Sequence, residues 1–420
     1  MTKSKKSSSL MSYAGTFGAL VILCVVLAIA SPNFFKYSNM MSVLKQTSFN
    51  ALVSTGMLLC LITAGIDLSV GANATFAACL AGMLVNKGMN NPVLLLVVAI
   101  VGGTLIGWIN GMLLTRLHLP HPFVSTLGMK NVLWGGALII TNSQMVSFSG
   151  NDAVMWLGSK TFGGFPVSFI VVIAIYIIMH ILLTKTALGR SIYCVGGNPE
   201  AARLSGINSA NVLTFCYTLS GFMAALAGIV SIGRSGICNG VNAIQPYDTD
   251  AIAACIIGGA SFMGGKGTMV GTMLGALIIA VLRNGFSLLS VSSAVQNLVL
   301  GLVIIGAVLL DDHVGVDHIE HGLRHFLYGP SADVLAVFEY KLGVGKLGAP
   351  CLEGFGVEHV AMHDVDIDVD RCDVILVFQA ERHKARSGTV VVAVDAVYKV
   401  GATLYHTLVD EFLIGLFLAG

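Results

Sequence analysis

The chain has 420 residues, of which 55% are hydrophobic and only 11% are charged, and its mean hydropathy is +0.84. Because soluble chains carry about 25% charged residues, this composition excludes an ordinary soluble domain and favours a polytopic membrane protein. The net charge of +1 hides an abrupt change, since residues 1–310 hold 15 Lys/Arg against 5 acidic residues and residues 311–420 hold 8 against 17. We therefore expect a lipid membrane and no nucleic acid as a partner, and a boundary near residue 311.

Ten apolar segments follow one another before residue 311, and each is a predicted membrane helix. A helix needs about 20 residues to cross the hydrocarbon core, so we expect the shorter segments to be broken or re-entrant. The predicted fold is an all-α polytopic membrane protein with about ten transmembrane helices, some of them short or broken. The segments are 14–31, 49–65, 69–86, 93–115, 123–141, 166–183, 211–232, 249–263, 268–284 and 291–310.

The first ten residues are polar and basic, so the first apolar run could be a signal peptide or an uncleaved span. Its length and the many spans that follow favour an uncleaved span. A modest excess of Lys/Arg on one side then places the N-terminus in the cytoplasm. The predicted domains are a cytoplasmic segment at 1–13, a transmembrane domain at 14–311 and an unrelated tail of uncertain structure at 312–420.

Asp67 is the only acidic residue among the first 150 and lies between two apolar runs. An ionisable residue at membrane depth is costly and usually functional, but Asp67 or Ser69 could instead cap the next helix. The two roles are compatible, because transporters place binding groups at broken helix ends. Amides within the spans could contact a hydroxyl-bearing solute or bridge helices. The candidates for a substrate path are Asp67, Ser69, Asn73, Asn110, Asn131, Gln296 and Asn297.

Asp248 and Asp250 precede a short apolar run and are predicted to cap its helix, with a place at the outer mouth of a path as the alternative. The stretch SFMGGKGTMVG after that run is not a nucleotide-binding P-loop, because Ala260 stands where that motif needs its first glycine. We predict a tight turn there. No nucleophile–histidine–acid set stands out, and the nine cysteines include no CxxC, so we assign no catalytic residue and no metal site.

The longest polar interruption before residue 310 is TKTALGRSIYCVGGNPEAARLSGIN at 184–208. Asn198 can cap a helix, Pro199 suits its first position and Gly206 suits the residue past its end. The ends of such a short helix need water or a partner, so it must lie at the membrane surface. Spacing alone leaves open whether this is an ordinary loop or a docking element. Glycine-rich turns are predicted before the helix, at Gly189 and at Gly196-Gly197.

This segment resembles the cytoplasmic loop of the permease subunits of ABC importers for monosaccharides, of the ribose, xylose, arabinose and galactose type. Three further stretches match that family in order and spacing: GIDLSVG at 65–71, PFVSTLG at 122–128 and DAIAACIIGGASFMGGKGTMVGTMLGALI at 250–278. In the family this loop docks on the ATPase subunit. The resemblance therefore implies an ATPase-coupling role for Gly189, Arg190, Gly196, Gly197, Asn198, Pro199, Glu200, Arg203 and Gly206.

The resemblance implies a permease subunit of a sugar importer in the bacterial plasma (inner) membrane, working as a homodimer or with a close relative. It implies a cytoplasmic ABC ATPase and an extracytoplasmic sugar-binding protein as partners. ATP and Mg²⁺ would be bound by the ATPase, so we expect no cofactor in this chain and no enzymatic activity. The alternative is a gradient-driven secondary transporter of small polar solutes, which usually carries intramembrane acids or histidines; only Asp67 suggests one here.

The resemblance ends at residue 311, and two interpretations of the tail stay open. A fused cytoplasmic domain could form strands at Asp364–Asp370 and Thr389–Val394, and His359 with His363 could bind a metal. The reversal of charge favours instead residues read out of frame or beyond a natural stop. In that case we expect no compact core, and Phe412–Leu418 is too short for an eleventh span.

Overall fold

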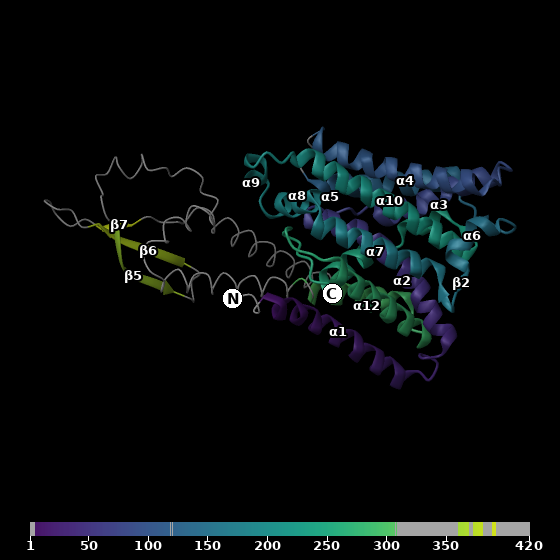
Figure 1. Cartoon of the computed structure of the whole chain (residues 1–420), viewed down its shortest axis with the longest axis horizontal. Helices are drawn as coiled ribbons and strands as arrows, with labels where there is room; N and C mark the ends of the chain where they lie inside the picture. Colours follow the sequence, from purple (N-terminus) through teal and green to yellow (C-terminus); the bar gives the residue numbers. More distant parts are fainter. Residues whose placement is uncertain are drawn as a thin grey trace, which may run out of the picture. The chain divides into compact units, whose positions relative to one another are not determined.

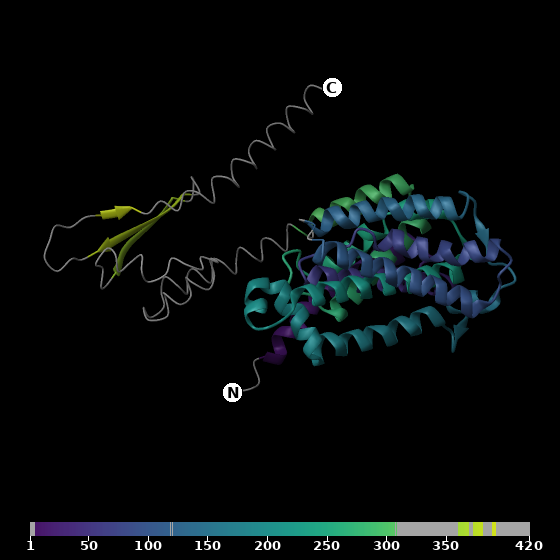
Figure 2. The same cartoon turned by 90° about the horizontal axis from the view of Figure 1, so that it is seen from above.

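The structure, a computed structural model, describes residues 5–117, 119, 121–306 and 308, and in the tail 360–368, 373–380 and 389–391. It divides into two units, residues 1–319 and 320–420, which are described separately. The first unit is a bundle of long helices (Figures 1 and 2), which confirms the predicted all-α membrane fold. Six described helices are long and apolar enough to cross a membrane: α1 (Lys5–Ala30), α4 (Pro92–Thr115), α5 (Pro122–Ile140), α7 (Val167–Lys185), α10 (Ser209–Ser235) and α12 (Met269–Leu288).

Four further helices coincide with the other predicted segments: α2 (Tyr37–Ile62), α3 (Val70–Asn86), α11 (Tyr247–Ile257) and an apolar helix at Ser293–Gly306. At 1.5 Å per residue, the 17 residues of α3 and the 11 of α11 reach only about 25 and 16 Å. Both are shorter than a hydrocarbon core of about 30 Å. The expectation of broken helices is therefore confirmed.

The two short helices begin at a common point inside the bundle. A non-helical stretch at 63–69 leads into α3, and strand β4 (Ile237–Cys238) and the 3-10 helix η1 (Gly240–Ile244) lead toward α11. A β-carbon added at Gly71 would lie 2.8 Å from Cβ of Tyr247, so the first turns of α3 and α11 touch. Irregular backbone at membrane depth is tolerated only against protein or a water-filled cavity, which makes this junction a candidate for function.

Helix α10 is the centre of the bundle and packs closely on α2, α3 and α4. Glycine permits the closest of these approaches. A β-carbon added at Gly107 of α4 would lie 2.8 Å from Cα of Gly221 in α10, and one at Gly111 would lie 2.8 Å from Cα of Thr214. Small residues at this spacing let helix backbones meet in lipid.

The two ends of the bundle differ (Figure 1). At one end lie the start of α1 and two short helices, α8 (Ala187–Gly197) and α9 (Pro199–Leu204). At the other end lie α6 (Asp152–Ser159) and strand β2 (Thr161–Phe162), which pairs with β3 (Phe165–Pro166). Strand β1 (Val146–Ser147) pairs with β4. The polar segment 184–208 and the N-terminal helix therefore begin on the same side of the membrane domain.

In the second unit the described residues form an antiparallel sheet of β5 (Val360–Asp368), β6 (Asp373–Ala380) and β7 (Thr389–Val391), in that order. Strands β5 and β7 overlap the two segments for which strands were considered, and β6 was not anticipated. The predicted boundary at 311, His359 of the predicted metal pair and Phe412–Leu418 lie outside the described residues.

Candidate functional site

The polar segment 184–208 folds as two capped helices. Asn198 Oδ1 accepts a hydrogen bond from Ala201 N–H at 3.0 Å, and Gly206 follows the helix with φ +81°. The predicted cap, first turn and end of α9 are thus confirmed. The glycine turns predicted at Gly189 and Gly196-Gly197 are wrong, because all three glycines lie within α8.

Close packing, rather than a turn, explains two of these glycines. A β-carbon at Gly189 would overlap the carbonyl oxygens at the end of α7, and one at Gly196 would overlap the carbonyl oxygen of Ile62. Ile62 is the last residue of α2. Helix α8 is therefore pressed backbone to backbone against the end of α2.

Helix α9 presents charge and apolar surface outward. Glu200 and Arg203 form an ion pair of 3.0 Å one turn apart, and their side chains are 74% and 70% exposed. Arg190 and Leu204 are also exposed. Because an exposed pair adds little to stability, these side chains can contact a partner at little cost to the fold. We name this face, with Arg190, Glu200, Arg203 and Leu204, the α8–α9 surface.

The α8–α9 surface is joined to the membrane domain through the loop at 258–268. Tyr193 of α8 donates a hydrogen bond to the carbonyl oxygen of Gly267 at 2.7 Å. Burial, together with nearby Tyr13, raises the pKa of the Tyr193 hydroxyl, so it keeps its proton and remains a donor at neutral pH. In the same loop, Gly265 N–H donates to the carbonyl oxygen of Ile62 at 2.8 Å. Gly264 and Gly265 have positive φ, which confirms the predicted tight turn.

A buried polar cluster surrounds Asp67, which is 1% exposed. Its Oδ1 accepts hydrogen bonds from Ser69 N–H at 3.0 Å and Ser69 Oγ at 2.6 Å, and its Oδ2 accepts from Ser220 Oγ of α10 at 2.8 Å. Asn110 Nδ2 of α4 donates to Ser69 Oγ at 2.8 Å. Asp67 therefore orders the turn that starts α3 and also ties that turn to α10, while Ser69 ties it to α4.

The other candidate amides separate into two groups. Asn73 Nδ2 donates to the carbonyl oxygen of Gly103 at 3.0 Å and, like Asn110, bridges helices. Asn131, Gln296 and Asn297 have no described hydrogen bond to the Asp67 cluster. Asn131 is exposed near the middle of α5, with its amide nitrogen bonded to a carbonyl of its own helix. Gln296 bonds to the carbonyl oxygen just before its own helix, and Asn297 is exposed.

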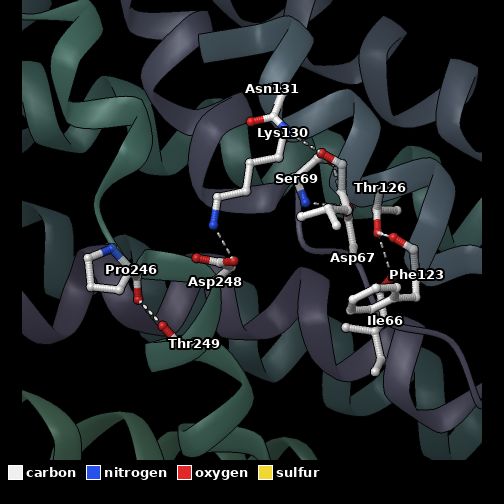
Figure 3. A network of polar contacts seen from close by, with 11 residues as sticks. Ile66, Asp67, Ser69, Phe123, Thr126, Lys130, Asn131, Pro246, Asp248 and Thr249 are labelled. Atoms are coloured by element: carbon white, nitrogen blue, oxygen red, sulfur yellow. Dashed lines mark hydrogen bonds and ion pairs between the residues drawn. The ribbon is translucent and has the colours of Figure 1, made fainter. Parts of the chain in front are cut away.

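Two ion pairs bind the first turn of α11 to neighbouring helices. Lys130 Nζ of α5 lies 2.7 Å from Asp248 Oδ2 (Figure 3). Arg283 of α12 holds both carboxylate oxygens of Asp250, each at 2.6 Å. The prediction that these aspartates cap the helix is wrong, since the capping position is Pro246 and both acids lie inside the first turn. There the two carboxylates lie near the positive end of the helix dipole, which stabilises negative charge. Each carboxylate also faces a cation from another helix.

Sequence reasoning missed Lys130 and Arg283 as partners. A signal was available, because a cation inside an apolar span needs a partner or water. Lys130 and Arg283 each stand in an apolar run of the sequence. The segment that the structure places beside them, α11, contains only two acidic residues, Asp248 and Asp250.

Comparison with known proteins identifies the family. The family described as "Branched-chain amino acid transport system / permease component" matches residues 39–308. The chain belongs to this family. It is a membrane-spanning permease subunit of an ABC importer rather than an enzyme, and a multi-pass protein of the bacterial inner membrane.

Curated relatives match most of the chain. The ribose import permease protein of Bacillus subtilis is 40% identical over 307 residues, which is 72% of this chain and 93% of the relative. The ribose import permease protein of Haemophilus influenzae is 36% identical over 304 residues, which is 71% of this chain and 93% of the relative. The galactose/methyl galactoside import permease protein of Escherichia coli is 33% identical over 324 residues, 72% and 96%.

Proposed function

We propose that this chain is the membrane-spanning subunit of an ATP-driven importer of monosaccharides. One observation carries the proposal: relatives that match over 90% or more of their own length are named for ribose, allose or galactose import. The description of the family names branched-chain amino acids instead. The sugar relatives outweigh that description because their identity of 31–40% runs through the whole membrane domain.

The partner on the cytoplasmic side is an ABC ATPase, and it docks on the α8–α9 surface. The exposed ion pair and the exposed leucine of α9 support this, since they give a partner both charge and apolar area. The docking segment includes the glycines and the capping residues assigned to 184–208 above. ATP and Mg²⁺ would be bound by the ATPase, and no cofactor is expected in this chain. The start of α1, at the same end of the bundle, then lies in the cytoplasm.

A short series of contacts would transmit the docking of the ATPase to the translocation path. Helix α8 touches the end of α2 at Ile62, and five residues later the chain reaches Asp67, where α3 begins. A shift of α8 would move the stretch 63–69 and with it the junction of α3 and α11. The two states of alternating access would differ in this contact, which is how ATP binding could favour one of them.

The path itself runs between this chain and a second permease copy, a homodimer being the simplest case, and an extracytoplasmic sugar-binding protein delivers the substrate. The Asp67 cluster lies at the junction of two short helices, where discontinuous helices of transporters place binding groups. Asp67, Ser69, Ser220 and Asn110 are its members, and Asn73, which joins α3 to α4 through the carbonyl oxygen of Gly103, is a further path candidate. Asn131 on α5 is a separate path residue.

Co-expression with an ABC ATPase and a sugar-binding protein of the same organism tests the proposal. A tagged chain should retain the ATPase through purification, and cells should take up labelled D-ribose, D-allose or D-galactose above the level of cells that lack the chain. Uptake of L-leucine with none of the three sugars would contradict the monosaccharide assignment and favour an amino-acid importer. Uptake that persists without the ATPase would favour a gradient-driven transporter.

A further inference from the structure

We propose that Lys130 and Asp248, with the neighbouring Asn131, form a binding station for substrate hydroxyl groups on the translocation path. This inference rests on the proposed function and adds to it a site outside the Asp67 cluster. Figure 3 shows the lysine side chain extended from α5 toward the carboxylate on α11.

The pair lies deep in the membrane domain. Lys130 is the ninth of the 19 residues of α5, so at 1.5 Å per residue it stands about 12 Å from the start of a helix about 28 Å long. Its partner lies in the first turn of α11, at the junction with α3. A charged pair at this depth borders the interior of the bundle or a water-filled cavity, because lipid does not accommodate it.

The pair has unused hydrogen-bonding capacity. The side chain of Asp248 is only 5% exposed, yet within the described part of the chain its Oδ1 has no hydrogen-bond partner. Such a buried orphan acceptor is costly unless something else fills it. The side chain of Lys130 is 23% exposed, and its ammonium has three N–H donors but is bonded to a single carboxylate oxygen.

Asn131 offers a further polar group next to this pair on α5. It follows Lys130 on α5, it is exposed near the middle of a helix that crosses the membrane, and its Oδ1 is available. An exposed amide beside an incompletely used ion pair indicates a face that meets water rather than lipid. We infer that this face of α5 borders the path between the two permease copies.

The chemistry fits a polyhydroxylated solute. A hydroxyl group both donates and accepts, so one substrate hydroxyl can donate to Asp248 Oδ1 and a neighbouring one can accept from Lys130 Nζ. No charge on the substrate is needed, because the station is neutral as a whole. Adjacent hydroxyls on a monosaccharide ring offer both functions at once.

The chain contains its own matched control. Arg283 and Asp250 also form an ion pair between α11 and a neighbouring helix, but both carboxylate oxygens are used by the guanidinium at 2.6 Å. This pair fixes α11 in place and, unlike Asp248, leaves neither carboxylate oxygen without a hydrogen-bond partner. Replacing Arg283 and Asp250 therefore removes one ion pair of α11 and leaves Lys130, Asp248 and Asn131 unchanged.

The first test replaces each pair by apolar residues, since a buried ion pair exchanged for apolar side chains of similar volume often keeps the fold. The double variant Lys130→Met/Asp248→Leu and the control Arg283→Met/Asp250→Leu are assembled with ATPase and binding protein in proteoliposomes, at saturating D-ribose. We expect uptake to fall about tenfold or more in the first, with ATP hydrolysis retained, and about twofold at most in the control. Equal uptake by the two variants would overturn the inference.

A second variant guards against misfolding. Asn131→Leu changes an exposed side chain that bonds only to its own helix, so the fold does not depend on it. We expect several-fold slower uptake of D-ribose with normal amounts of protein in the membrane. Uptake equal to that of the natural chain would overturn the role of Asn131.

A third measurement does not depend on transport. Asn131→Cys should react with a membrane-impermeant methanethiosulfonate, and D-ribose with its binding protein should slow the reaction. Ile177→Cys on the apolar helix α7, where Ile177 is 56% exposed, should not react, and the natural chain corrects for its exposed Cys194. An unreactive Asn131→Cys would overturn the inference. No import of any of the three sugars by the natural chain would instead refute the proposed function, and labelling would still report on the station.

Discussion

Replacing Gly196 by alanine should separate the α8–α9 surface from the membrane domain. The added β-carbon would overlap the carbonyl oxygen of Ile62 and lie 2.9 Å from the nitrogen of Gly265. That nitrogen donates to the same carbonyl oxygen at 2.8 Å. Overpacking costs about 1–3 kcal/mol and the weakened hydrogen bond about 0.5–1.5 kcal/mol, whereas alanine gains at most about 1 kcal/mol over glycine in a helix. The net cost, about 0.5–4.5 kcal/mol, can be relieved only if α8 moves away from α2.

The control is the next residue. A β-carbon at Gly197 would meet no atom within 4 Å outside its own neighbours, so Gly197→Ala should be neutral or slightly stabilising. Both variants are assembled with the ATPase and binding protein, and thermal stability, ATP hydrolysis and sugar uptake are measured. We expect Gly196→Ala to melt at lower temperature and to hydrolyse ATP with little uptake, and Gly197→Ala to match the natural chain in thermal stability. Equal stability and uptake in the two variants would refute a transmission contact between α8 and α2.

Changes at three other places in the chain test further parts of this account. Glu200→Arg changes a side chain that is 74% exposed, so the permease should reach the membrane but hydrolyse ATP without uptake; full uptake would rule out docking through Glu200. Asp67→Asn keeps an oxygen acceptor for Ser69 and should retain partial uptake, whereas Asp67→Ala leaves the Ser69 and Ser220 hydroxyls without their acceptor and should cost about 1–3 kcal/mol in a melting assay; unchanged uptake in both would remove Asp67 from the path. A chain that ends at residue 312 should take up sugar as well as the full chain, and loss of uptake on truncation would show that the tail contributes.

Local signals in the sequence predicted local structure well. Asn198, Pro199 and Gly206 define a helix through their own backbone preferences, and α9 begins and ends where they indicate. The cap predicted at Asp67 or Ser69 is confirmed only in position: Ser69 stands just before α3, but its side chain makes no capping hydrogen bond, and Asp67 accepts instead from the Ser69 N–H, which orders the turn before the helix. The ten apolar segments were found because length and hydropathy do not depend on tertiary contacts.

Features that depend on distant partners could not be read in the same way. Gly196 suggests a turn in the sequence, but its real constraint is the carbonyl of Ile62, 134 positions earlier in the chain. Ser220, which bonds to Asp67, lies 153 residues away from it. Asp248 and Asp250 resembled a capping pair until the packing of α5 and α12 on α11 placed a cation beside each. Apolar helices have few features that specify which neighbour they contact, so these pairings emerge only from the folded bundle.

Uptake into sealed proteoliposomes tests the central claim most directly. The purified chain is reconstituted with its ATPase and loaded with ATP and Mg²⁺, and sugar-loaded binding protein and labelled sugar are added outside. We predict accumulation that requires the ATPase, the binding protein and hydrolysable ATP, and that ionophores leave unchanged. Accumulation driven by an imposed proton or sodium gradient in vesicles without the ATPase would contradict the account.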